Sequence, residues 1–142
     1  MGERLLVPFD GSPLSRRALE RAITKHAEDR ITVLFVVDPL LAVYEAETEG
    51  LPAARTWHDR MAEEADAVCA EARGLAAEHD CDIETATEFG RPARTILEYA
   101  DEHAVDHVVM GSHGREGVSR LVLGSVAERV MRQAPVPVTI VR

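Results

Sequence analysis

The sequence predicts an α/β fold, a single domain over residues 1–142 with a five-stranded parallel sheet and helices on both faces. Short apolar runs alternate with segments of helical periodicity along the whole chain. The runs are nearly continuous in Val, Ile and Leu, as in strands that are buried on both faces. Aromatic residues make up 4% of the chain and all hydrophobic residues 46%, so an aliphatic core is expected.

The first elements have clear boundaries. A strand is predicted at Leu5–Phe9, where Asp10-Gly11 stops it. Ser12 followed by Pro13 predicts the start of a helix, because serine is a preferred N-cap and proline suits the first helical position. A second strand, rich in β-branched residues, is predicted at Ile31–Val37 and ends at Asp38-Pro39.

The pattern breaks down between Leu40 and about Thr56, where three glutamates, a glycine and a proline predict a mobile acidic loop, a candidate lid. Apolar residues then recur in steps of three and four, which predicts a long helix. The members of this helical stripe are Trp57, Met61, Ala65, Val68, Ala72 and Leu75.

The second half continues the alternation. Its expected elements are a strand at Cys81–Phe89, a helix opened by Gly90-Arg91-Pro92, a strand at Val105–Met110, a helix to about Gln133 and a strand at Val136–Val141. In open sheets of this kind, ligands bind beyond the carboxyl ends of the strands, where the strand order reverses. The functional residues are therefore expected in the loops after the first and fourth strands.

Charge and cysteine content narrow the functional classes. The formal net charge is −9, from 25 acidic and 16 basic residues, and such a field opposes binding to nucleic acid and to anionic membranes. Cys69 and Cys81 have no metal-ligand spacing, which indicates reduced thiols. The sequence enters a strand directly after Met1 and no apolar run reaches bilayer length, so we expect no signal peptide, no membrane partner and a cytoplasmic protein.

The basic residues are almost all arginine, since Lys25 is the only lysine. An acidic surface nearly free of lysine resembles that of halophilic proteins, which work in concentrated salt. A coding bias toward Arg and Ala would produce the same composition, and the sequence leaves both explanations open.

The most informative segment is Gly111-Ser112-His113-Gly114-Arg115-Glu116-Gly117, which is followed by Gly124-Ser125. Glycines after a strand let the main chain approach a bound group, and the N–H groups of such a loop can converge on an anion. Ser125 and Glu128 have the spacing of a capping box, so a helix is expected to begin there and to direct its N-terminal N–H groups at the same anion.

This segment is neither a Walker A loop nor a dinucleotide fingerprint, because Gly-Lys-Ser/Thr and Gly-x-Gly-x-x-Gly are both absent. Two interpretations remain from the residues alone. The glycines could bind phosphate, or they could only turn the chain after a strand.

The spacing Gly111-x2-Gly114-x9-Gly124-Ser125 resembles the ATP-binding signature of the universal stress protein family. The resemblance covers essentially the whole chain, including Pro8-Phe9-Asp10-Gly11-Ser12 and the closing Pro135-Val136-Pro137-Val138. It implies a universal stress protein (Usp) domain over residues 1–142. It also implies the adenine nucleotide alpha hydrolase-like fold with strand order 3-2-1-4-5, which would place Asp10 and Gly111 side by side.

The resemblance also assigns site residues. It implies that Asp10 meets the adenosine part of ATP, that the main chain of Val36 hydrogen-bonds adenine and that Met110 packs near the base. It places five further residues around the ribose and the phosphates: Gly111, Gly114, Gly124, Ser125 and Val126.

Other candidates have simpler interpretations beside the functional one. Asp10 could be only a turn residue that bonds the backbone before a helix. His113 could reach a phosphate or face solvent from a loop. His103 and His107 flank the fourth strand without a partner at useful spacing, and we expect both at the surface.

The last strand suggests how the chain associates. Val136, Val138 and Ile140 are apolar, whereas Pro137 cannot donate to a ladder and belongs at a sheet edge. An apolar edge invites pairing. Universal stress proteins commonly dimerise through this strand, so the resemblance implies a homodimer; a monomer with a covered edge is the alternative.

The function that the resemblance implies is that of an ATP-binding regulatory module in the stress response. A slow ATPase or phosphotransfer enzyme is an alternative, although no general base and no phosphate-binding lysine can be assigned. A dimeric interaction scaffold without nucleotide is another, and the complete glycine signature argues against it. A triphosphate commonly brings Mg²⁺ with it, and the sequence leaves open whether it does so here.

Overall fold

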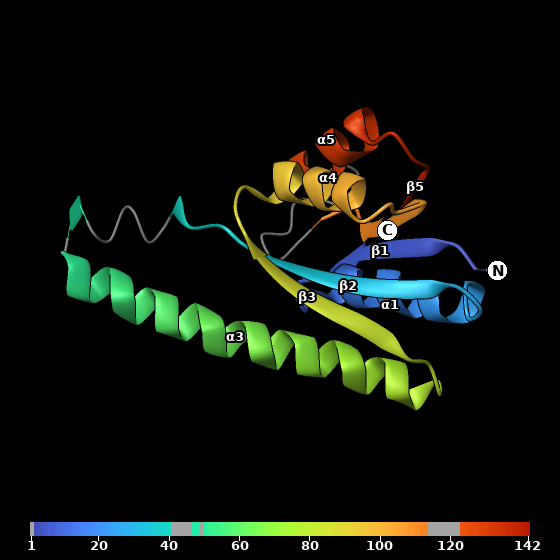
Figure 1. Ribbon diagram of the computed structural model, residues 1–142, viewed down its shortest axis with the longest axis horizontal. Helices are drawn as coiled ribbons and strands as arrows, with labels where there is room; N and C mark the ends of the chain where they lie inside the picture. The colour runs from blue at the N-terminus through green and yellow to red at the C-terminus, as the bar shows by residue number, and fades with distance from the viewer. Residues whose placement is uncertain (1, 41–46, 49, 114–122) are drawn as a thin grey trace.

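Five parallel strands form one sheet in the order β3-β2-β1-β4-β5, which confirms the expected fold (Figure 1). The computed structural model describes residues 2–40, 47–48, 50–113 and 123–142, without the side chains of residues 51–54. The strands are β1 (Arg4–Pro8), β2 (Arg30–Val37), β3 (Ile83–Phe89), β4 (His107–Gly111) and β5 (Val138–Val141).

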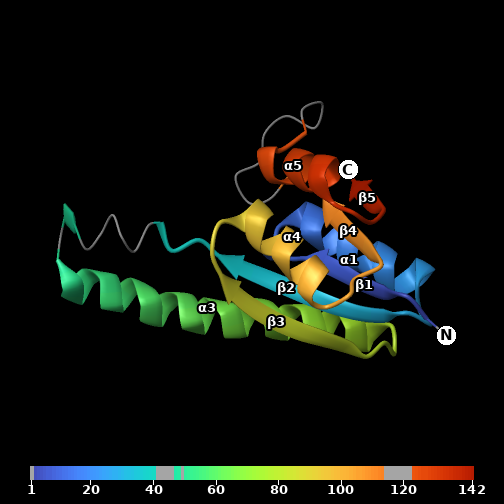
Figure 2. The same cartoon turned by 45° about the horizontal axis from the view of Figure 1, so that its top comes forward.

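Helices cover both faces of this sheet. Those of the described residues are α1 (Pro13–Lys25), α3 (Leu51–Glu78), α4 (Pro92–Glu102) and α5 (Ser125–Gln133). Helices α1 and α3 lie on one face, and α4 and α5 lie on the other (Figures 1 and 2). Each pair buries its own aliphatic cluster against the sheet.

Alternation along β2 shows how the two clusters arise. Val33 and Phe35 are buried on the side of α1 and α3, whereas Leu34 is buried on the side of α4. Successive side chains of a strand point to opposite faces, so a continuous apolar run fills both cores.

Strand β1 lies at the centre of the sheet, where the strand order reverses. It pairs with β2 on one side, in a register that ends at Pro8 opposite Leu34, and with β4 on the other, where Leu5 lies opposite His107. The loops after β1 and β4 therefore leave the sheet next to each other, at the place where open α/β sheets bind ligands.

The start of α1 follows the sequence prediction. Ser12 is the N-cap, and its hydroxyl accepts a hydrogen bond from Ser15 N at 3.3 Å. Pro13 stands in the first turn, where its missing N–H leaves no bond unmade.

The acidic loop expected as far as Thr56 is shorter than predicted. Helix α3 already begins at Leu51, after an N-cap at Gly50 with a φ of 91° that favours glycine. Pro52, which suggested a loop, lies in the first turn of the helix, where proline is well tolerated. The resulting 28-residue helix extends well beyond the end of the sheet (Figures 1 and 2). Residues 41–46 and 49 lie outside the described part.

Other boundaries differ by a few residues. β3 begins at Ile83, β4 at His107 and β5 at Val138, each two residues later than predicted. In the sheet, Pro137 still contributes its carbonyl oxygen, which accepts from Val108 N at 3.0 Å.

Cys69 and Cys81 are both free thiols, as expected. Burial raises the pKa of the Cys81 thiol, with a smaller contribution from Asp82, which keeps it protonated and poorly reactive. Among the described residues, no helix combines the length and apolar character that a membrane crossing requires.

Candidate functional site: a cavity at the reversal of strand order

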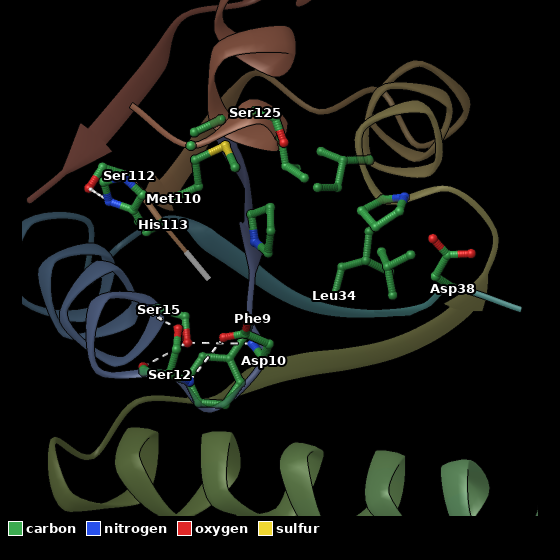
Figure 3. Close-up of a pocket in the computed structure, with 18 residues that line it drawn as sticks. Phe9, Asp10, Ser12, Ser15, Leu34, Asp38, Met110, Ser112, His113 and Ser125 are labelled. Atoms are coloured by element: carbon green, nitrogen blue, oxygen red, sulfur yellow. Dashed lines mark hydrogen bonds between the residues drawn. The ribbon is translucent and has the colours of Figure 1, made fainter. Parts of the chain in front are cut away.

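A cavity of about 570 Å³ opens at the carboxyl ends of β1, β2 and β4 (Figure 3). Ser112 and His113 lie on one side of it, and Leu34 and Asp38 lie on the opposite side (Figure 3). Its volume is in the usual range for a small-molecule or cofactor site. It occupies the position that the alternation of strands and helices predicts.

One end of the cavity is apolar. Leu34 and Val36 reach it from β2, and Pro92 and Ile96 from α4. Met110 joins them from β4 and is itself buried. A flat apolar group would be enclosed at this end.

The main chain of Val36 adds polar groups to this apolar end. In a parallel strand, alternate residues direct both their N–H and their C=O to the same neighbouring strand. Leu34 O accepts from Phe9 N on the β1 side, whereas Val37 O accepts from Gly90 N on the β3 side, both at 2.9 Å. Val36 therefore faces the β1 side, two residues beyond the last β1 pair at Leu34. Its N–H and C=O lie past the end of the ladder, at the cavity wall.

Gly111 ends β4 where the chain passes close to α1. A Cβ at this position would lie 2.8 Å from Leu14 Cβ and 3.0 Å from Leu14 C, closer than real Cβ atoms come. The glycine is therefore required by the contact between β4 and the start of α1, and this close packing brings the loop after β4 beside the loop after β1.

Gly124 joins the loop after β4 to the start of α5. Its N–H donates to Ser112 O at 2.9 Å, and a Cβ added to it would lie 2.7 Å from that same oxygen. The first turn of α5 therefore lies directly against the cavity wall. The N–H groups of this turn have no intrahelical partner, and the helix dipole is positive there.

The expected capping box is wrong. Gly124, not Ser125, is the N-cap of α5, and no side chain forms a cap hydrogen bond. Ser125 is the first helical residue and is exposed at the cavity. Glu128 instead forms an ion pair with Arg132 one turn later. The spacing alone did not show which residue would adopt the extended N-cap conformation.

The loop after β1 forms a compact hydrogen-bonded turn at the floor of the cavity. Asp10 Oδ1 accepts from Ser12 N at 2.9 Å, and Ser15 Oγ donates to Ser12 O at 3.0 Å (Figure 3). Asp10 is thus a turn residue, as one interpretation held, and it also lines the cavity. The two roles coexist because a carboxylate has several acceptor positions.

Asp38 is the second carboxylate at the cavity. Its Oδ1 accepts from Leu40 N at 2.9 Å, and its Oδ2 lies 3.7 Å from Arg91 Nε. Both members of the pair are partly exposed, so their interaction adds little to stability. Among the described residues that line the cavity there is no lysine or arginine. Among the described residues, the groups that could donate to an anion there are main-chain N–H groups, serine hydroxyls and His113.

His113 is 7% exposed, so the solvent-facing interpretation is wrong. Its Nδ1 lies 3.1 Å from Ser112 Oγ, while its buried Nε2 has no partner among the described residues. The ring atom Cδ2, which is bonded to Nε2, lies 3.4 Å from the position of a Cβ on Gly124. The buried Nε2 of His113 therefore lies on the side of the first turn of α5, and among the described residues both carry polar groups without a partner.

The cavity brings together seven of the eight residues that the sequence singled out, and their contact with a ligand stays a prediction. These are Asp10, Val36, Met110, Gly111, Gly124, Ser125 and Val126. Gly114 lies outside the described residues.

The sequence analysis missed several lining residues. Leu34 could have been found, because it lies two residues before Val36 and shares its face of β2. Ile96 lies in the helix predicted after Gly90-Arg91-Pro92, and helical periodicity does not distinguish a core position from a cavity wall. Ser12, Ser15 and Asp38 carry no local signal of a ligand, since each also forms a turn or cap.

The fold defines a doubly wound α/β protein with a cavity at the reversal of its strand order. A model of the universal stress protein family matches residues 1–142, and the chain belongs to that family. Universal stress protein MJ0531 of Methanocaldococcus jannaschii is 34% identical over 145 residues, which cover 99% of this chain and 82% of that protein.

Solved structures agree with this assignment. The structure of protein MJ0577 of M. jannaschii has a TM-score of 0.83 to this chain at 24% identity, covering 99% of this chain and 96% of that one, a likeness of fold. A universal stress protein solved in complex with cAMP has a TM-score of 0.72 at 26% identity, covering 99% of this chain and 97% of that one.

Proposed function

We propose that the chain binds ATP in the cavity and acts as a regulatory nucleotide-binding protein of the stress response. The observation that carries the proposal is the arrangement of the cavity: an apolar slot edged by the main chain of Val36 at one end, and the N-terminus of α5 at the other. These two ends match the two chemically different parts of a nucleotide.

The apolar end suits adenine in particular. Adenine presents a donor, the exocyclic amino group, beside an acceptor, the ring N1. The C=O and N–H of Val36 offer the complementary acceptor and donor in one plane. Guanine presents the reverse order, a carbonyl beside an N1–H, and would leave both groups of Val36 mismatched.

The other end suits phosphate. The first turn of α5 supplies main-chain N–H groups and a positive dipole end, and the exposed Ser125 supplies a hydroxyl at its first position. Because Gly124 packs closely against Ser112 O, position 124 has no room for a Cβ, and no side chain from this position occupies the space in front of the α5 N-terminus. The relative solved with cAMP, 26% identical, holds an adenine nucleotide and supports the same ligand class here.

A bound triphosphate would bring Mg²⁺ held mainly by its own oxygens and by water. No group of three or more acidic, histidine or cysteine side chains suited to a metal occurs among the described residues. The candidate general bases among the described lining residues are Asp10, Asp38 and His113. Asp10 Oδ1 and Asp38 Oδ1 already accept hydrogen bonds within their loops, and His113 Nδ1 lies 3.1 Å from Ser112 Oγ. We propose binding without steady turnover, because the two cavity carboxylates are engaged in their loops and no lysine or arginine is among the described lining residues. We also propose that the chain acts in the cytoplasm.

The test is to purify the protein, denature it and analyse the supernatant for nucleotide by chromatography, then to titrate ATP and GTP calorimetrically. We expect retained or added ATP to bind, with GTP weaker by at least about tenfold because two mismatched hydrogen bonds cost a kcal/mol or more each. Steady release of ADP would indicate an ATPase instead. A chain that neither retains nor binds ATP would be a scaffold, and the proposal would be wrong.

We also propose a homodimer through β5. This strand is at the edge of the sheet, and all four of its residues are only half-buried. Val136, Val138 and Ile140 pack against the cluster under α4 and α5 while part of their surface stays exposed. Light scattering should give twice the 15.6 kDa mass of the chain. A single-chain mass at the highest concentration measured would contradict the dimer.

A further inference from the structure

Two histidines, His26 and His107, meet at the opposite end of the sheet from the cavity. His26 is the C-cap of α1, and His107 is the first residue of β4. Their rings lie edge to face with centroids 5.4 Å apart. His107 is half-buried, so the expectation that it is a surface residue without a partner is wrong.

The two rings connect helix α1 with strands β4 and β5. His107 Nε2 lies 2.8 Å from Thr139 Oγ1 on β5. His26 Nδ1 lies 2.9 Å from Asp29 Oδ2, in the turn between α1 and β2. The chain of contacts therefore runs from the end of α1 through β4 to the edge strand β5.

The two imidazole rings differ in the group that would neutralise a positive charge on each of them. A charged His26 has the carboxylate of Asp29 beside it. A charged His107 would have only the neutral hydroxyl of Thr139, and it would face His26. Asp29 is engaged elsewhere, since its Oδ2 faces His26 and its Oδ1 accepts from Glu3 N at 2.8 Å, and it acts on His107 only through longer-range attraction.

The remaining charged groups near His107 do not change this conclusion. Burial, and then the facing His26, lower the pKa of His107 below the ordinary 6.5, and attraction by Glu3 and Asp29 opposes this only in part. Asp106, which precedes His107, directs its carboxylate to Arg4 N at 2.9 Å on β1. Thr139 on β5 carries no charge.

We propose that His26 and His107 form an acid-sensitive clamp that holds the edge strand β5 against the end of α1 and releases it when both imidazoles are protonated. Two like charges on half-buried, touching rings repel each other, and the cheapest relief is for His107 to leave its place. That movement breaks its contact with Thr139, the side chain of β5 that it reaches from β4. The pH thereby controls how tightly the edge strand β5 is held to the rest of the sheet.

The direction of the pH effect follows from linkage. A histidine whose pKa is lowered by folding takes up its proton less readily in the folded state than in the unfolded state. Its contribution to stability is therefore present above about pH 6.5 and is lost as the pH falls below that value. The clamp should hold at neutral pH and weaken in mild acid.

Hydrogen exchange of the full chain, followed by mass spectrometry, tests the clamp at about pH 7.5 and about pH 5.5, one unit on either side of the ordinary histidine value. Rates are expressed as protection factors, which remove the intrinsic effect of pH. In the unaltered protein, protection of β5 should fall in acid, by up to about tenfold for one histidine whose pKa in the unfolded chain is about 6.5, while β2 keeps its protection.

Three variants separate the clamp from other effects. His107→Gln keeps an N–H near the position of Nε2 but cannot be charged, and it should keep β5 protected at both pH values. His26→Gln removes the facing charge and should do the same. His79→Gln, at the exposed C-cap of α3, is the matched control and should behave like the unaltered protein.

The proposal would be overturned if His107→Gln lost protection in acid as the unaltered chain does. It would equally be overturned if β2 lost protection in parallel with β5, since that result indicates general unfolding, or if β5 stayed protected in the unaltered chain at the lower pH. If one glutamine variant fails to fold, the other still decides between these outcomes.

Discussion

Gly124→Ala should lower the affinity for ATP by about tenfold to a hundredfold, because two charge-assisted hydrogen bonds at about 1.5 kcal/mol each are at stake. The reason is space and not conformation. The backbone of Gly124 has φ −65° and ψ 153°, which any residue adopts. The new Cβ would lie 2.7 Å from Ser112 O and 3.4 Å from His113 Cδ2, so α5 must move away from the loop after β4. Calorimetric titration with ATP measures the loss.

The same substitution elsewhere is the matched control for this prediction. Gly74 lies in α3 with no atom within 4 Å of an added Cβ. Gly74→Ala should therefore bind ATP like the unaltered chain and should be more stable by up to about 1 kcal/mol, since alanine is the better helix former. Full ATP affinity in a folded Gly124→Ala variant would exclude the N-terminus of α5 as the phosphate site.

A milder variant keeps this prediction testable if Gly124→Ala does not fold. Ser125→Ala removes an exposed hydroxyl at the first position of α5 and adds no bulk. It should fold normally and lose part of the ATP affinity, while its affinity for adenosine, which has no phosphate, should be unchanged. An equal loss for both ligands would place Ser125 away from the phosphates.

Leu34→Ala should lower the free energy of unfolding by about 2 to 5 kcal/mol, a large share of the roughly 5 to 15 kcal/mol that holds a domain of this kind together. The side chain of Leu34 is 0% exposed and packs between β2 and α4. Removing it leaves a void that the rigid sheet cannot close. Urea unfolding followed by circular dichroism measures the change.

Leu40→Ala is the control for this second prediction, because Leu40 is 58% exposed. Its effect should stay within about 0.5 kcal/mol. Leu34 also lines the apolar end of the cavity, so Leu34→Ala should weaken ATP binding by enlarging the slot for the base. A loss of stability no greater than that of Leu40→Ala would mean that β2 and α4 can repack around the void.

Local sequence patterns predicted most of the secondary structure and its order. The order of strands and helices follows from apolar periodicity, and the start of α1 follows from Ser12-Pro13, because capping and proline geometry act over a few neighbouring residues. The glycine spacing identified the cavity wall, since Gly111 and Gly124 are each required by a close backbone approach.

Local errors occurred where one residue has two uses. Gly50 and Pro52 mark loops in many sequences, yet here they cap and open α3. Ser125 and Glu128 have capping-box spacing, yet Gly124 takes the N-cap position because only a residue without a side chain fits against Ser112 O. In both cases the surrounding chain selects one of two uses that the residue types allow.

A local sequence pattern does not show which distant residues come into contact in the fold. His26 and His107 are 81 positions apart in the printed sequence, and nothing near either predicts that their rings touch or that Thr139 lies beyond them. The burial of His113 and the open main-chain edge of Val36 likewise arise from where neighbouring strands end. Periodicity reports which face of an element is buried, whereas pairwise contacts between elements depend on how the layers pack, and that packing exists in the folded chain alone.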